Sequence, residues 1–150
     1  MTRVRLAEAD DRDWIDECHR VVRFELSDER AELHAIAEVD GDRAAVGRIL
    51  RIGPGRVELG GMFVDPRHRG RGLARSIVTF LLESVVDPTI YCIPFSHLVG
   101  FYESFGFRPL EKDEAVPELV AKKVSECEQA FPEGVALLVL ERPGTSTGAP

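Results

Sequence analysis

The segment 57–75 constrains the fold of this chain more than any other. It reads Val-Glu-Leu-Gly-Gly-Met-Phe-Val-Asp-Pro-Arg-His-Arg-Gly-Arg-Gly-Leu-Ala-Arg. The apolar run at its start predicts a strand that breaks at Asp65-Pro66, and a helix is expected after Gly72. Glycines allow a tight turn and close approach of a ligand, and the free N–H groups of the following helix point at that ligand. The segment therefore predicts a pocket for an anion such as a pyrophosphate.

The spacing Arg67-x-x-Gly70-x-Gly72 between a strand and a helix resembles motif A of the GNAT superfamily, the acyl-CoA-dependent N-acyltransferases. It differs from the glycine patterns of dinucleotide-binding folds and of nucleotide triphosphatases. An Arg/Gly-rich surface turn before a helix is the alternative interpretation of these residues alone.

A second segment, Tyr102-x-x-x-Gly106-Phe107, resembles motif B of the same family, where a helix ends and a strand begins. Gly106 can adopt the left-handed conformation that ends a helix. The resemblance covers roughly residues 35–142, and it makes the surface-turn interpretation of motif A much weaker.

The resemblance implies an α/β (α+β) fold, the GNAT fold. Its central sheet would be mixed and mostly antiparallel, with six to seven strands, helices on both faces and a bulged strand near 57–64. Gly60-Gly61 agrees with the bulge, because glycine inside a strand marks a bulge or a close approach, although a simple twist defect is the alternative. We expect one GNAT domain over residues 1–142 and a disordered tail over residues 143–150.

Patterning outside the two motifs predicts further elements. A helix capped by Asp10 or Asp11 should run to about Phe24, and a weak helical turn should follow from Ser27 to Leu33. A hairpin should turn at 40–42, and an amphipathic helix should be inserted between 111 and 133. Since the family usually has a shorter connection there, the resemblance implies that this helix covers the side where the acyl acceptor binds.

Composition excludes several classes of protein. The net charge of −7 argues against a nucleic-acid partner, and no apolar run reaches the ~20 residues that span a membrane. Three cysteines at wide spacings indicate reduced thiols in a cytoplasmic protein, and no cluster has the spacing of metal ligands. Four arginines nevertheless gather within 67–75, at Arg67, Arg69, Arg71 and Arg75. For Arg67 and Arg75, capture of an anion and pairing with acidic neighbours both remain open.

The resemblance also implies the cofactor site. Acetyl-CoA would be the co-substrate, with no metal. Backbone N–H groups of Met62, Phe63 and Val64 would polarise the thioester carbonyl and pair with the pantetheine arm. The amides from the loop into the helix would hold the pyrophosphate, namely those of Arg69, Gly70, Arg71, Gly72, Leu73 and Ala74. Where the family often has an asparagine that bonds the cofactor arm, this chain has Phe95, and the adjacent Ser96 could substitute.

Two catalytic residues are implied. Tyr102 occupies the position of the family's general acid, and a phenol with a pKa near ~10 is a proton donor at neutral pH. Packing against the cofactor is its alternative role. Glu58 is the carboxylate inside the predicted bulged strand and is our candidate base, although it could face solvent or pair with an arginine. Weaker candidates are Glu25, Glu29, Glu32 and Glu103, and deprotonation through ordered water needs no single base.

The resulting hypothesis is an N-acetyltransferase that moves acetyl from acetyl-CoA to a primary amine, on a small molecule or peptide, by direct transfer in a ternary complex. An acidic surface would attract a cationic amine. The alternative is a non-catalytic acyl-CoA-binding regulatory domain, and an RNA-binding module is disfavoured by charge. A homodimer is possible, as in other members of the family. The histidines His19, His34 and His97 have no partner pattern and are interpreted as surface or packing residues.

Overall fold

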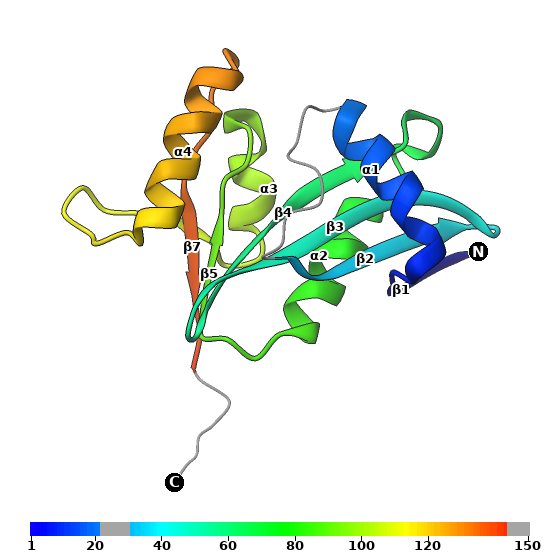
Figure 1. Cartoon of the computed structure of the whole chain (residues 1–150), viewed down its shortest axis with the longest axis horizontal. Helices are drawn as coiled ribbons and strands as arrows, with labels where there is room; N and C mark the ends of the chain where they lie inside the picture. Colours follow the sequence, from blue (N-terminus) through cyan, green and yellow to red (C-terminus); the bar gives the residue numbers. More distant parts are fainter. Residues whose placement is uncertain (22–30, 144–150) are drawn as a thin grey trace, which may run out of the picture. The chain divides into compact units, whose positions relative to one another are not determined.

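The computed structural model describes residues 1–21 and 31–143, which form a seven-stranded, mostly antiparallel sheet with helices (Figure 1). The predicted end of the first helix near Phe24 and the tail beyond residue 143 lie outside these ranges, as do Glu25 and Glu29. The predicted helical turn at 27–33 lies outside them up to residue 30, and its last three residues belong to a strand instead.

The chain divides into two compact units. The first comprises Met1–Arg51 and Leu59–Val85, and the second comprises Ile52–Glu58 and Val86–Pro150. The motif A segment from Leu59 onward therefore belongs to the first unit, whereas Glu58 and the whole of motif B belong to the second.

The sheet of the first unit runs in the order β1-β2-β3-β4. Antiparallel pairing joins the first three of these strands, and the predicted hairpin is confirmed. Asp40 and Gly41 form its turn with φ angles of 51° and 89°, the left-handed pair that suits the twist of a two-residue hairpin. The strands are β1 (Thr2–Leu6), β2 (Ala31–Val39), β3 (Asp42–Gly53) and β4 (Arg56–Val64); the end of β3 and the start of β4 belong to the second unit.

Alternation along β2 and β3 gives this part of the sheet two buried faces. Ile36 and Val46 pair across the strands and pack with Ile15 and Cys18 of α1 (Arg12–Val21). The next pair in register, Ala35 and Gly47, faces the opposite side, where α2 (Leu73–Ser84) lies (Figure 1).

Gly47 lets α2 approach the sheet closely. A methyl group there would lie 2.6 Å from Cγ2 of Ile77 and 3.1 Å from Cδ1 of Leu81. Helices on both faces, as the sequence predicts, are thus present in the first unit.

The start of α1 differs from the prediction. A 3₁₀ turn, η1 (Ala9–Asp11), precedes the helix, and its N-cap residue is Glu8 rather than Asp10 or Asp11. Asp11 is fully buried and accepts a hydrogen bond from the Glu8 backbone N–H at 2.7 Å. The same carboxylate pairs with Arg5 at 2.7 Å and with Arg43 at 2.7 Å, so it ties the helix start to β1 and β3.

The second unit has three short strands in the order β5-β7-β6, and β7 pairs antiparallel with both neighbours. They are β5 (Thr89–Cys92), β6 (Arg108–Pro109) and β7 (Leu138–Glu141). The predicted inserted helix is present as α4 (Glu118–Ala130), whose Val120 packs with the cross-strand pair Tyr91 and Val139. A shorter helix, α3 (Val99–Glu103), follows a 3₁₀ turn, η3 (Ser96–Leu98).

In the described part of the chain, no helix combines the length and apolar character that a membrane crossing requires.

Candidate functional site

The loop between β4 and α2 forms an open glycine turn. It contains the 3₁₀ turn η2 (Pro66–His68), and then Gly70 and Gly72 adopt φ angles of 81° and 73°. Gly72 is the N-cap of α2, and its carbonyl accepts the first helical bond, from Ser76 N–H, at 3.1 Å. A side chain added at either glycine would meet no atom within 4 Å. Backbone N–H groups at the start of α2 therefore border an open space, as an anion site requires.

The arginines of this loop separate into two kinds. The carboxylate of Asp65 accepts hydrogen bonds from the backbone N–H of Arg67 at 2.9 Å and from its Nη2 at 3.0 Å. The side chain of Arg67 therefore pairs with an acidic neighbour in this structure, and the Asp65 carboxylate raises its pKa. Arg69 and Arg71 on the same loop are exposed, so their charges are available to a ligand in solution.

The strand before the loop is irregular where the sequence predicts a bulge. Gly61 has a φ of 61° inside β4, a left-handed conformation that glycine adopts at bulges. Met62, Phe63 and Val64 follow it and are half-buried. These three residues and the 69–74 loop lie in the same unit, so the structure keeps the predicted carbonyl-polarising and pyrophosphate-binding segments on consecutive elements.

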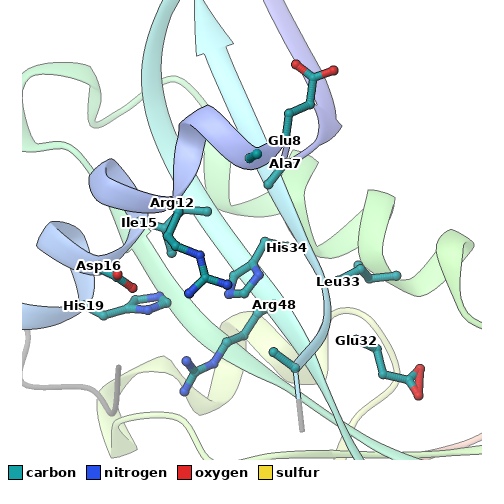
Figure 2. Close-up of a pocket in the computed structure, with 12 residues that line it drawn as sticks. Ala7, Glu8, Arg12, Ile15, Asp16, His19, Glu32, Leu33, His34 and Arg48 are labelled. Carbon is teal, nitrogen blue, oxygen red and sulfur yellow. The ribbon is translucent and has the colours of Figure 1, made fainter. Parts of the chain in front are cut away.

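A cavity of about 600 Å³ lies in the first unit, between α1 and the strands β2 and β3 (Figure 2). Arg12, His19, His34 and Arg48 line it, and none of them was a predicted site residue. His19 is buried, and its Nε2 lies 3.0 Å from the carbonyl oxygen of Gly61. The interpretation of His19 as an ordinary packing residue therefore misses a contact with the irregular strand.

One signal in the sequence could have revealed this cavity. Arg48 stands in the middle of an apolar run that becomes fully buried from Ala44 to Leu50, and charged residues are almost never buried without a purpose. His19 and His34 gave no comparable signal, because they are far apart in sequence and meet only through the packing of α1 on β2, with ring centroids 6.2 Å apart.

In the second unit, Tyr102 lies on α3 and is 4% exposed. Its ring packs edge-on against Phe101 and Phe107, at centroid distances of 4.9 Å and 6.0 Å. Burial, and to a smaller extent the nearby Cys92, raises the pKa of the phenol above its usual value. The hydroxyl has no hydrogen-bond partner among residues 1–21 and 31–143. Tyr102 is therefore a protonated donor held in an apolar setting.

Gly106 shows why motif B ends as it does. It takes a φ of 102°, and a methyl group there would lie 3.1 Å from Cδ1 of Leu140 on β7. Glycine thus permits both the turn out of α3 and its packing against the sheet of the second unit.

Glu58 does not face solvent. It is 2% exposed, and both of its carboxylate oxygens accept hydrogen bonds from Nζ of Lys123 on α4, at 3.0 Å and 2.8 Å. The sequence left open a pairing with an arginine, but the partner in the structure is a lysine on the inserted helix. Any proton abstraction by Glu58 has to compete with this ion pair.

Ser96 lies at the start of η3 and is exposed. Its backbone N–H donates to the carbonyl of Gly134 at 3.0 Å, and its hydroxyl makes no capping hydrogen bond. The neighbouring Phe95 stacks on His97 and meets Phe131 edge-on. The serine hydroxyl is thus left available at the surface of the second unit.

Within 1–21 and 31–143, no group of three or more His, Cys, Asp or Glu side chains is placed to hold a metal ion.

Comparison with known proteins gives a family match over most of the chain. The sequence model of the Acetyltransferase (GNAT) family matches residues 3–107, which include the 57–75 segment and Tyr102-x-x-x-Gly106-Phe107. No curated protein sequence matches significantly.

Solved structures resemble the fold at low sequence identity. Rv2747 from Mycobacterium tuberculosis, solved with CoA, has a TM-score of 0.74 and 18% identity over 94% of this chain and 99% of its own. The ribosomal-protein-S18-alanine N-acetyltransferase of Escherichia coli has a TM-score of 0.69 and 16% identity over 99% and 100%.

N-acetylglutamate synthase from Neisseria gonorrhoeae, solved with coenzyme A and N-acetyl-glutamate, has a TM-score of 0.73 and 15% identity. The alignment covers 94% of this chain but only 35% of that synthase.

Proposed function

The chain belongs to the GNAT acetyltransferase family, and from this premise we propose that it is an N-acetyltransferase. It moves an acetyl group from acetyl-CoA to a primary amine on a small molecule or a peptide. The amine nitrogen attacks the thioester carbonyl in a ternary complex, the C–S bond breaks, and the departing thiolate takes up a proton. The observation that carries the proposal is the open glycine loop at the N-terminus of α2.

The loop fits the pyrophosphate of CoA. Gly70 and Gly72 leave open space above the backbone, and the N–H groups of the first turn of α2 have no helical partner. The segment that would hold the phosphates is 69–74, with the positive end of the helix dipole behind it and two exposed arginines beside it. Coenzyme A bound in several fold neighbours supports the same ligand class.

The residues after Gly61 supply the carbonyl-polarising role. N–H groups of Met62, Phe63 and Val64 can donate to the thioester oxygen and to the pantetheine amides, because a strand presents alternate N–H groups along its edge. The left-handed Gly61 before them redirects β4 at this point. Ser96 offers an exposed hydroxyl for the cofactor arm.

Tyr102 is the proposed proton donor to the departing thiolate. Burial keeps its phenol protonated by raising its pKa, and its hydroxyl is not committed to another residue of the described chain. It is therefore in its acid form at neutral pH and can donate a proton to the thiolate.

Glu58 remains the proposed base. Because Lys123 engages both carboxylate oxygens, we expect Glu58 to act on the amine through a water molecule, with Lys123 fixing the orientation of the carboxylate. We further propose a cytoplasmic protein, since Cys18, Cys92 and Cys127 are all free thiols.

The competing function is a regulatory domain that binds acyl-CoA without turnover. The fold neighbours do not indicate which acceptor this chain uses. They include an enzyme named for N-acetylglutamate and another named for a ribosomal protein. Calorimetric titration with acetyl-CoA tests the shared binding step. Micromolar binding by the wild type supports both functions, whereas absence of binding removes both. Release of CoA thiol with an amine present then separates the enzyme from the regulatory domain.

A further inference from the structure

His19 belongs to the buried face of α1. It lies in the last turn of that helix, four residues after Ile15, and is only 1% exposed. Residues four apart share a helix face, so Ile15 packs on the sheet while His19 projects from α1 into the cavity (Figure 2). A polar ring that is this deeply buried needs a hydrogen-bond partner, because an unpaired buried polar group is costly.

One such partner of His19 is the backbone of β4. Its Nε2 lies 3.0 Å from the carbonyl oxygen of Gly61. A carbonyl oxygen only accepts, so the imidazole must carry a proton on Nε2 and donate the hydrogen bond from there. The last turn of α1 is thereby tied to the irregular point of the strand.

The peptide bond carries this contact on to Met62. The carbonyl of Gly61 and the N–H of Met62 belong to one trans peptide unit, in which the two groups point in opposite directions. A hydrogen bond from His19 on one side therefore fixes the direction of the Met62 N–H on the other. It also polarises the peptide group, which makes that N–H a stronger donor.

The backbone at this point is permissive and needs such a restraint. Gly60 and Gly61 precede Met62, and Gly61 has a φ of 61°. A peptide plane next to glycine meets little steric resistance when it rotates. Without a partner for the Gly61 carbonyl, the Met62 N–H would not keep one direction.

The next two side chains hold β4 from opposite faces of the sheet. Phe63 packs against the cluster that contains Ile15 of α1. Met62 lies on the other face, where its Cε is 3.2 Å from the place of a methyl group added at Gly47. These contacts fix the position of the strand, and the bond from His19 adds the orientation of the peptide plane.

We propose that His19 is a positioning residue for acyl transfer. Its hydrogen bond to Gly61 aims the N–H of Met62 at the thioester carbonyl of bound acetyl-CoA. This inference rests on the proposed acetyltransferase function and adds a residue of α1 to the carbonyl-polarising segment 62–64. His19 acts through the peptide group alone and exchanges no proton with either substrate.

The kinetic test uses two substitutions of nearly equal size. His19→Gln keeps a side-chain N–H, whereas His19→Met fills the same space without a donor. Both remove the other contacts of the imidazole alike, so the difference between them isolates the bond to Gly61. We expect kcat to fall about 10- to 100-fold in His19→Met and to stay within about 3-fold of the wild type in His19→Gln, with the Kd for CoA nearly unchanged in both.

Arg20→Gln is the control, since Arg20 is an exposed neighbour on α1 that pairs with Glu17. It should keep the wild-type kcat. Circular dichroism and urea unfolding identify the variants that fold. Equal values of kcat in folded His19→Gln and His19→Met overturn the inference.

A binding measurement observes the Met62 N–H itself and does not depend on the variants. Met1 and Met62 are the two methionines of the sequence, so labelling with ¹⁵N-methionine gives a simple amide spectrum. Acetyl-CoA should shift the Met62 amide proton downfield relative to CoA, which lacks the carbonyl. His19→Met should reduce this difference, and His19→Gln should keep it. A wild-type Met62 amide that responds equally to CoA and acetyl-CoA overturns the inference.

The same measurement needs no turnover, so it separates this inference from the proposed function. If the acetyl-dependent shift requires the donor at residue 19 but no CoA thiol is released with any amine, the role of His19 in aiming the N–H stands and the enzyme function fails. If His19→Met forms acetylated products as fast as the wild type, the enzyme function stands and the role of His19 is wrong.

Discussion

The side chain of Arg48 lies directly on the backbone of Gly61. Three of its atoms, Cγ, Cδ and Nε, would come within 2.9 Å of a methyl group placed on that glycine. Gly61 also has a φ of 61°, which side chains rarely adopt. The glycine therefore has two functions, since it turns β4 and provides the surface on which a buried guanidinium rests.

Gly61→Ala should displace Arg48 and disturb the end of β4. We expect kcat to fall about 10-fold or more while the Kd for acetyl-CoA stays near that of the wild type, because the N–H groups after Gly61 lose their aim. Steady-state kinetics and calorimetry on the same preparation measure the two effects.

Gly41→Ala is the matched control. Gly41 also has a positive φ, 89°, but a methyl group there would meet nothing within 4 Å. Both variants should lose roughly 1–2 kcal/mol of stability from backbone strain. A similar fall in kcat in both would mean that strain alone causes it, and the contact between Gly61 and Arg48 would have no functional weight.

Tyr102→Phe should lower kcat by about 10²- to 10⁴-fold with little change in acetyl-CoA binding, because the phenol donates only to the departing thiolate. Burial raises the pKa of Tyr102 above ~10. Its acid form therefore persists up to that pH, and the wild-type kcat should show no descending limb from this group between pH 7 and 10. An unchanged kcat in the variant would exclude Tyr102 as the donor.

The pair of Glu58 and Lys123 allows the base to be separated from a structural ion pair. Glu58→Gln alone leaves the half-buried ammonium of Lys123 without its anion, so stability should fall by roughly 1–3 kcal/mol. Adding Lys123→Met should restore most of that stability. If Glu58 is the base, the double variant stays inactive although its stability is restored. Recovery of activity along with stability would show that the pair has only a structural role.

Gly72→Asp should abolish acetyl-CoA binding, because a carboxylate would project into the space proposed for the pyrophosphate. Gly72→Asn is matched in size and in tolerance of the left-handed conformation, but it adds no charge. Calorimetry should show a larger loss of affinity for Asp than for Asn. Wild-type affinity in the Asp variant would place the cofactor elsewhere.

Asp11→Asn should reduce the free energy of unfolding by about 3 kcal/mol, because two arginines lose a fully buried carboxylate. Hydrogen bonds from Arg5 hold the pKa of Asp11 far below its usual value. The unfolded chain therefore binds more protons below about pH 4, and wild-type stability should fall as the pH drops through that range. Urea unfolding between about pH 3 and 7 should show a flatter profile for the variant, and parallel profiles would contradict the pairing.

Local patterns explain what the sequence could predict. The strand, the glycine turn and α2 follow from residues 57–81, because periodicity and glycine spacing are local properties. The hairpin turn at Asp40-Gly41 and helix α4 were confirmed for the same reason. Tyr102 was predicted from the resemblance of Tyr102-x-x-x-Gly106-Phe107 to motif B of the family.

Contacts between distant segments explain the rest. Asp11 looks like a helix cap in sequence, but Arg43 comes from β3, which only the fold places beside it. Lys123 reaches Glu58 across a separation of 65 residues. The cavity of the first unit needs α1, β2 and β3 together, and apart from Arg48, a charge inside an apolar run, the residues discussed in its lining carry no pattern by themselves.

Mass spectrometry of the products tests the central claim most directly. Purified protein is incubated with acetyl-CoA and a panel of amines that includes the amino acids, with Tyr102→Phe as the control. We expect one or more N-acetylated products that appear together with free CoA and form far more slowly with the variant. Tight binding of acetyl-CoA without any acetylated product would contradict the enzyme and favour the regulatory domain.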